Sequence, residues 1–216
     1  CRACHVAHAS AERNLLAAAE GQLCTKCHDA GGSGFKKAHG GYPIATAGKT
    51  PCTICHDPHS AQQGKLLKAS VHPVVTGGGC DSCHAGPTAP KPFAVQEQGG
   101  KLCANCHDVP KLAAGGKVEH LPFKKMECLT CHDPHAGRGP KLTLAAGNAL
   151  CIRCHPQMGE KVTAKHQAVE FGCTGCHQPH AGKVKGLLAT DVASNCATCH
   201  SAVTDNAKKF KSKHPP

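Results

Sequence analysis

Residues 128–135 read CLTCHDPH, and the first five of them follow a pattern, Cys-x-x-Cys-His, that occurs nine times in the 216 residues. The nine copies use all eighteen cysteines of the chain. They are CRACH at Cys1, CTKCH at Cys24, CTICH at Cys52, CDSCH at Cys80, CANCH at Cys103, CLTCH at Cys128, CIRCH at Cys151, CTGCH at Cys173 and CATCH at Cys196.

The chemistry of this pentapeptide points to c-type haem. Its two thiols add to the vinyl groups of the porphyrin, and the histidine that follows becomes the proximal ligand of the iron. A zinc site would use the Cys-x-x-Cys pairs but gives no reason for a histidine after each one. A disulfide framework fails for the same reason. The sequence therefore predicts nine covalently attached haem c groups, each named below by its first cysteine.

The predicted site residues follow from the nine motifs. The predicted haem-attachment residues are Cys1, Cys4, Cys24, Cys27, Cys52, Cys55, Cys80, Cys83, Cys103, Cys106, Cys128, Cys131, Cys151, Cys154, Cys173, Cys176, Cys196 and Cys199. The predicted proximal ligands are His5, His28, His56, His84, His107, His132, His155, His177 and His200.

Nine haems on 216 residues leave 24 residues for each haem, and the chain has only five Phe, one Tyr and no Trp. Apolar side chains cannot supply an ordinary core at this density. The 24 Gly and 15 Pro interrupt helices and strands rather than extend them. We predict few short α-helices and mostly irregular coil around a stacked haem chain, with little or no β-sheet and no stable apoprotein.

The formal charge of +11 suggests nucleic acid at first sight. Haem propionates would offset much of it, so no nucleic-acid partner is predicted. No stretch approaches the roughly 18 apolar residues of a membrane span, and no transmembrane segment is expected. Because haem c is attached outside the cytoplasm, the chain is expected to be a mature, processed one, extracellular or at the cell surface after export, with the periplasm as the alternative.

The spacing of the motifs indicates a modular array. First cysteines are separated by 23, 28, 28, 23, 25, 23, 22 and 23 residues. First-type motifs continue as CHxxH, and second-type motifs, at Cys24, Cys103, Cys151 and Cys196, lack the extra histidine. Cys80 lacks it too, but opens a module with Cys103. The predicted modules are residues 1–38 (Cys1, Cys24), 39–71 (Cys52), 72–119 (Cys80, Cys103), 120–165 (Cys128, Cys151) and 166–216 (Cys173, Cys196), within one continuous haem-cored unit.

Nine of the eighteen histidines lie outside the motifs, one for each predicted haem. Any one of them alone could be a surface histidine, but the equal counts favour a second axial ligand on every iron. These predicted distal ligands are His8, His39, His59, His72, His120, His135, His166, His180 and His214.

Four of these histidines, here called tail histidines, stand three residues after a proximal histidine, on the same helical face. Such a pair cannot reach one iron from opposite faces of the porphyrin, so each tail histidine must bind a neighbouring haem. The predicted pairing gives His8, His59, His135 and His180 to the Cys24, Cys103, Cys151 and Cys196 haems. It gives His39, His72, His120 and His166 to the Cys52, Cys80, Cys128 and Cys173 haems.

This pairing leaves His214 and the Cys1 haem without an assigned partner. FKSKH, ending at His214, copies FKKAH, ending at His39, and an element of this kind usually precedes a first-type motif. The repeat therefore ends with a ligand element at His214 and begins with a haem motif at Cys1 that has no ligand element before it. We expect His214 of one subunit to ligate the Cys1 haem of the next, which would propagate a head-to-tail filament. The alternatives are that His214 folds back within its own chain, or that a longer native N-terminus carries its own histidine.

CxxCHxxH alternating with CxxCH over essentially the whole chain resembles the doubled-CxxCH multihaem cytochromes c. That group includes extracellular electron-transferring cytochromes, some of which form filaments, and decahaem subunits inside outer-membrane porins. The resemblance implies long-distance electron transfer through alternating parallel-stacked and T-shaped haem pairs, but it does not by itself separate these members. Together with the expected link from His214, it favours a subunit of an extracellular conductive filament, with redox proteins or extracellular acceptors as partners. A monomeric periplasmic or porin-embedded electron carrier is the alternative.

A multihaem reductase is a further alternative. It needs a haem with a free or unusual axial position, but the chain has no CxxCK variant and enough histidines for every iron. No enzymatic activity is therefore predicted.

Overall fold

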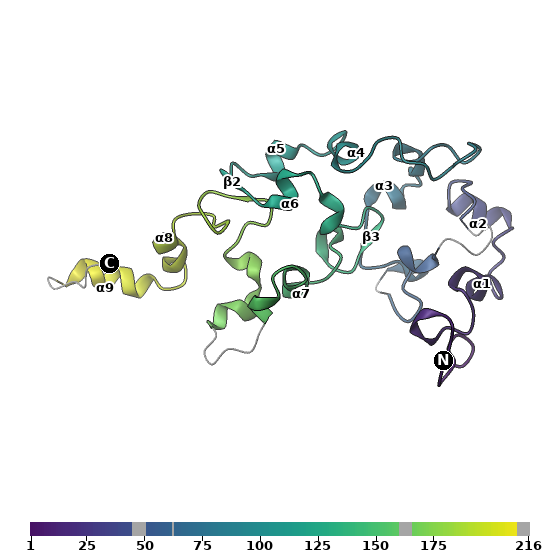
Figure 1. Ribbon diagram of the computed structural model, residues 1–216, viewed down its shortest axis with the longest axis horizontal. Helices are drawn as coiled ribbons and strands as arrows, with labels where there is room; N and C mark the ends of the chain where they lie inside the picture. The colour runs from purple at the N-terminus through teal and green to yellow at the C-terminus, as the bar shows by residue number, and fades with distance from the viewer. Residues whose placement is uncertain (45–50, 62, 160–165, 211–216) are drawn as a thin grey trace. The chain divides into compact units, whose positions relative to one another are not determined.

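The computed structural model describes residues 1–44, 51–61, 63–159 and 166–210 (Figure 1). The chain forms two compact units, each made of two segments. The first unit contains Cys1–Gln98 and Cys131–Ala146, and the second contains Gly99–Thr130 and Gly147–Pro216. Because residues 131–146 belong with the first unit, these units do not coincide with the five modules predicted from motif spacing.

Short helices separated by coil make up most of both units, as predicted (Figure 1). The longest described helix, α9, has nine residues, and isolated helices shorter than about 12 residues are marginal in water. The helices are α1 (Glu20–Thr25), α2 (Ser33–Ala38), α3 (Pro73–Thr76), α4 (Gly100–Ala104), α5 (Val109–Leu112), α6 (Leu121–Lys124), α7 (Asn148–Ile152), α8 (Val192–Ala197) and α9 (Ser201–Lys209). The main 3-10 turns are Arg13–Leu15, Cys52–Ile54, Gly64–Leu66, Cys80–Ser82, Cys128–Thr130, Pro140–Leu142, Pro156–Gly159, Gln167–Phe171 and Cys173–Gly175.

Extended structure in the described residues is limited to two antiparallel pairs of two-residue strands and isolated bridges, which agrees with the predicted scarcity of β-sheet. In the first unit β1 (Ser70–Val71) pairs with β3 (Ala136–Gly137). In the second unit β2 (Val118–Glu119) pairs with β4 (Ala181–Gly182).

Each small sheet places a tail histidine beside a histidine from upstream in the sequence. The backbone N–H of His72, just after β1, donates to the carbonyl of His135, just before β3, at 2.9 Å. The same bond joins His120 to His180 at 2.9 Å. Glycine follows the buried alanine in both β3 and β4, because a Cβ at Gly137 would lie 2.2 Å from the Leu142 carbonyl carbon. Two distant chain segments are thereby fixed at their histidines.

Very little of the polypeptide is buried. Among the described residues the buried hydrophobic side chains are Tyr42, Ala136 and Ala181, and no polar side chain is buried. The accessible surface is 15861 Å², against about 9,400 Å² for a compact protein of this mass. The polypeptide by itself therefore does not form an ordinary hydrophobic core. In the described part of the chain, no helix has the length and apolar character needed to cross a membrane.

Candidate haem-binding sites

A tight turn in the motif brings the histidine back over the first cysteine. The backbone N–H of the histidine donates to the carbonyl of the first cysteine at 2.9 to 3.1 Å in the motifs at Cys1, Cys24, Cys52, Cys80, Cys103, Cys151, Cys173 and Cys196. All eighteen cysteines lie in the described parts of the chain, and none of them forms a disulfide. The turn thus brings together two thiols and one imidazole, which is the set of groups that a covalently bound haem requires.

The two motif types have different local structures. The second-type motifs begin inside the short helices α1, α4, α7 and α8. Four first-type motifs begin instead with the 3-10 turns Cys52–Ile54, Cys80–Ser82, Cys128–Thr130 and Cys173–Gly175. The Cys80 motif has the first-type structure although it lacks the tail histidine.

A loop after each first-type motif holds the proximal imidazole, and sequence analysis missed it. The ring Nδ1–H donates to the carbonyl nine residues further on, and the histidine backbone bridges to the residue eleven further on. The Nδ1 to oxygen distances are 2.9 Å from His5 to Asn14, 2.8 Å from His56 to Lys65, 3.0 Å from His84 to Phe93, 2.8 Å from His132 to Lys141 and 2.5 Å from His177 to Gly186. The bond leaves Nε2 of each ring for a metal, as in other metal-binding histidines.

The loop leaves a recognisable sequence pattern: leucine stands ten residues after the proximal histidine in four of the five first-type motifs. Several residues there have left-handed backbone, including Asn14 (φ 58°), Lys65 (φ 59°) and Lys141 (φ 57°). Such conformations cost about 1 to 3 kcal/mol each in non-glycine residues and persist only where surrounding structure imposes them. The repeated strain indicates that orienting the proximal ring is what the loop does.

Among the described residues, five pairs of histidine rings are seen to face one another inside one unit or the other. The centroids lie 5.9 Å apart in His5–His59, 6.4 Å in His39–His56, 5.9 Å in His84–His135, 6.2 Å in His120–His155 and 5.9 Å in His166–His200. Each pair joins one proximal histidine to one predicted distal histidine. The ring planes are nearly parallel in His84–His135, at 7°, and strongly tilted in His39–His56, at 55°.

These separations fit an iron between the rings. Metal–imidazole bonds in proteins are about 2.0 Å, and a further 1.1 Å or so separates ring nitrogen from ring centre, so two imidazoles on opposite sides of one metal have centres about 6.2 Å apart. The observed range of 5.9 to 6.4 Å lies around that value. The residues present therefore suit a six-coordinate haem at these five positions.

The ring pairs correct most of the pairing predicted from sequence. His59 was assigned to the Cys103 haem, and His135 to the Cys151 haem; their rings lie instead against His5 and His84. His120 and His166 were assigned to the motif that follows each of them, and lie instead against His155 and His200. Of the five pairs, His39–His56 alone matches the prediction.

The length of the tether explains these differences. Twelve residues separate His39 from Cys52, which is enough chain to reach the far face of a porphyrin. Only seven residues lie between His120 and Cys128, and six between His166 and Cys173, and much of each stretch is helical and therefore compact. These histidines pass over the next motif and face the one after it.

The pairing predicted for the Cys1 motif differs too, because the ring of His59 of the same chain lies against His5, where the sequence analysis placed His214 of another subunit. His214 itself lies outside the described residues. Within those residues no second histidine ring faces His8 or His28 in the first unit, or His177 in the second.

Second-type motifs pack against the first-type motif that follows them. In the first unit the Glu20 carboxylate of α1 accepts hydrogen bonds from the backbone N–H and the hydroxyl of Thr53, at 2.5 and 3.0 Å. In the second unit the Asn148 side chain of α7 donates to the Val169 carbonyl and accepts from the Cys173 N–H, both at 2.7 Å. These contacts set neighbouring haem attachment sites side by side.

Burial also affects the pKa of one thiol and one imidazole. Burial, reinforced by the nearby Cys24, raises the pKa of the Cys52 thiol to about 11. Burial is also the largest influence on His135 and lowers its pKa, against the opposing effect of Asp133. The neutral imidazole that this favours is the form of histidine that binds metals.

Comparison with known proteins agrees with the motif analysis. The family model described as the doubled CXXCH motif matches residues 1–32, 43–71, 72–112, 120–160 and 166–205. A curated relative, the multiheme cytochrome MtrA of Shewanella baltica (strain OS185), is 26% identical over 146 residues, which cover 63% of this chain. The match spans 43% of the relative, less than half of its length. The matched segments cover most of the sequence, and the chain belongs to the doubled-CXXCH family of multihaem c-type cytochromes.

Proposed function

We propose that this protein carries electrons over long distances through nine covalently attached, bis-histidine haems and does not catalyse a reaction. The observation that carries the proposal is the set of five histidine pairs at 5.9 to 6.4 Å, each with a proximal and a distal member. A haem held from both sides has no coordination position open to a substrate. The haem supplies the redox chemistry, and the protein supplies spacing, burial and tuning of potential.

Contacts between motifs support a continuous path. Where a tail histidine serves a different haem from the proximal histidine three residues before it, the two irons are tethered through one turn of backbone. His56 and His59 join the Cys52 and Cys1 haems in this way. The packing of Glu20 on Thr53 brings the Cys24 and Cys52 attachment sites together as well. Electrons would therefore pass between neighbouring haems without leaving the protein.

Copies of this protein join head to tail in our proposal, within an extracellular or cell-surface filament; a monomeric periplasmic carrier is the alternative. Redox proteins or extracellular acceptors would take the electrons from it. In the described pairs, His120 and His166 each pass over one motif and face the next, second-type motif. If His214 likewise passes over one motif, it passes over the Cys1 motif of another copy, whose haem has His59 as its second ligand. It then reaches the Cys24 haem of that copy. This replaces the Cys1 haem as the acceptor of His214.

The predicted haem load can be measured directly. Nine haems should raise the mass of the 22.3 kDa chain by roughly 5.5 kDa, since each attachment through paired thioethers adds about 0.6 kDa. Intact-mass spectrometry of the purified protein gives the number. A smaller mass would mean that at least one motif carries no haem and would overturn the one-to-one count of haems and distal histidines.

All nine irons are expected to be low-spin and six-coordinate, because each has two histidines available. The reduced native protein should then bind carbon monoxide only after denaturation, which optical spectroscopy detects. A ferric high-spin charge-transfer band, or rapid carbon monoxide binding to the native protein, would contradict the conduit and favour a multihaem reductase.

A further inference from the structure

We infer that His135, although it stands in the Cys128 motif, is the second axial ligand of the Cys80 haem, and that Asp133 is the residue that positions it. The inference rests on the proposed bis-histidine haems and names how one of them is assembled. It also assigns a role to the Asp of CHDPH, which is neither a cysteine nor an iron ligand.

The ring geometry gives the first step. His84, the proximal histidine of the Cys80 motif, and His135 lie 5.9 Å apart and only 7° from parallel. The His84 Nδ1–H is engaged with the Phe93 carbonyl at 3.0 Å, which leaves its Nε2 for the iron. Fifty residues lie between the two histidines in sequence, so the site is made by tertiary packing.

The backbone around His135 gives the second step. Its N–H and that of Ala136 donate to one oxygen of the Asp133 carboxylate, at 2.9 and 3.3 Å. Its carbonyl accepts from the His72 N–H at 2.9 Å, and β3 begins at the next residue. The backbone of this ligand is therefore held on both sides, which fixes the direction of its ring.

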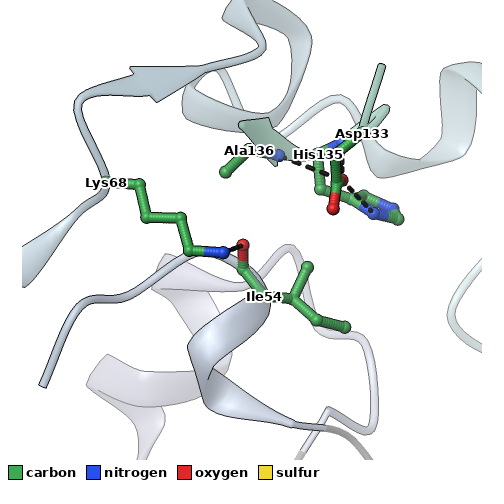
Figure 2. A network of polar contacts seen from close by, with 5 residues as sticks. All are labelled: Ile54, Lys68, Asp133, His135 and Ala136. Carbon is green, nitrogen blue, oxygen red and sulfur yellow. Dashed lines mark hydrogen bonds and ion pairs between the residues drawn. The ribbon is translucent and has the colours of Figure 1, made fainter. Parts of the chain in front are cut away.

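The Asp133 carboxylate also faces the imidazole, as Figure 2 shows. Its Oδ1 lies 3.7 Å from Nδ1 of His135, and both side chains are partly shielded from water. Lys68, the nearby cation in the figure, is engaged with the Ile54 carbonyl at 2.7 Å. Within the described residues no lysine or arginine nitrogen lies within 4 Å of this carboxylate. Its negative charge is therefore directed at the ligand ring.

At 3.7 Å this contact is too long for a hydrogen bond, so the carboxylate holds the backbone of His135 and acts on its ring through its negative charge, which increases the electron donation of the imidazole to a bound metal. Ferric iron gains more from this than ferrous iron, so Asp133 should lower the potential of the Cys80 haem. The other tail motifs provide a comparison. Asp57 makes the same backbone bond to His59, at 3.0 Å, and its charge also interacts with that imidazole, but among residues 51–61 no contact within 4 Å joins the carboxylate to the ring. Val6 and Gln178 occupy the equivalent position in the remaining two.

The ligand assignment is tested by combining variants of the holoprotein. His135→Ala should make one haem in nine high-spin and reactive with carbon monoxide. In a Cys80→Ala, Cys83→Ala background, which lacks the Cys80 haem, the same substitution should add no further high-spin haem. In a Cys151→Ala, Cys154→Ala background it should still add one. A further high-spin haem in the first background, or none in the second, would assign His135 to the Cys151 haem and refute the inference. Either background alone therefore decides between the Cys80 and Cys151 haems.

The role of Asp133 is tested by redox titration at constant pH. Asp133→Asn retains the acceptor for the backbone bonds but loses the charge, so all irons should stay low-spin while one of the nine reduction steps moves to higher potential. Asp57→Asn, at the equivalent position of the Cys52 motif, is the matched control. It should shift the reduction step of the haem bound by His59 by a smaller amount. Equal shifts, or none for Asp133→Asn, would refute the positioning role. A high-spin haem in the parent protein would instead count against the proposed function itself.

Discussion

Export of this chain without haem attachment should yield an unfolded polypeptide that is rapidly degraded. The described residues bury three hydrophobic side chains, and the chain exposes 15861 Å², so apolar burial within the polypeptide cannot offset the conformational entropy of folding. Haem binding and iron ligation must supply that free energy, as metal binding does in small metal-dependent domains. The measurement is the amount of protein recovered from a strain that cannot attach haem, and the circular dichroism spectrum of that protein.

A pair of single substitutions provides the matched control for this expectation. His132→Ala removes a predicted proximal ligand whose Nδ1–H donates to the Lys141 carbonyl at 2.8 Å. Lys37→Ala removes an exposed side chain in the last turn of α2. The His132 variant should accumulate far less than the Lys37 variant. Equal accumulation, or a folded apoprotein, would contradict a core built from haems.

His214→Ala should abolish head-to-tail assembly and leave one haem in nine five-coordinate. The substitution removes the histidine that we propose ligates the Cys24 haem of another copy, and an iron–imidazole bond is the specific link at that junction. Electron microscopy and sedimentation measure assembly, while carbon monoxide binding reports the missing ligand. Lys208→Ala, which changes an exposed side chain of the nearby helix α9, is the control and should assemble normally.

Three outcomes of that experiment would contradict the proposal. The parent protein could remain monomeric at high concentration with every haem six-coordinate. The His214→Ala variant could form filaments indistinguishable from those of the parent. Alternatively, the five-coordinate haem of the variant could disappear when Cys1 and Cys4 are also replaced; that would return His214 to the Cys1 haem and contradict the contact between His5 and His59.

The family, the haem chemistry and the kind of fold could be predicted from the motifs, because each attachment site consists of five consecutive residues whose chemistry does not depend on the rest of the chain. The scarcity of apolar side chains predicted short helices and little sheet, and the structure agrees. The loop that holds rings such as those of His5 and His56 was missed, although leucine ten residues after the histidine recurs in the sequence.

The pairing of histidines was mostly wrong because it assumed that a ligand serves the nearest suitable motif along the chain. His39 follows that assumption, since its tether to Cys52 is long. His59 faces a ring 54 residues away, and His135 one 51 residues away. The pairing of the two-residue strands β1 and β3 helps to hold the segment of His135, and so short a stretch has no periodicity by which sequence could reveal it.

The sequence by itself thus determined that this is a multihaem c-type cytochrome, and it predicts which residues bind haem and how many haems the chain holds, because covalent attachment and the proximal ligand are local properties of Cys-x-x-Cys-His. The tertiary structure decided which histidines face each other. That choice depends on backbone pairing between distant segments, on the close approach allowed by Gly137, and on side chains such as Glu20 and Asp133 that join one motif to the next or orient a tail histidine. These interactions act in space between residues far apart in the chain, so motif spacing carries no record of them.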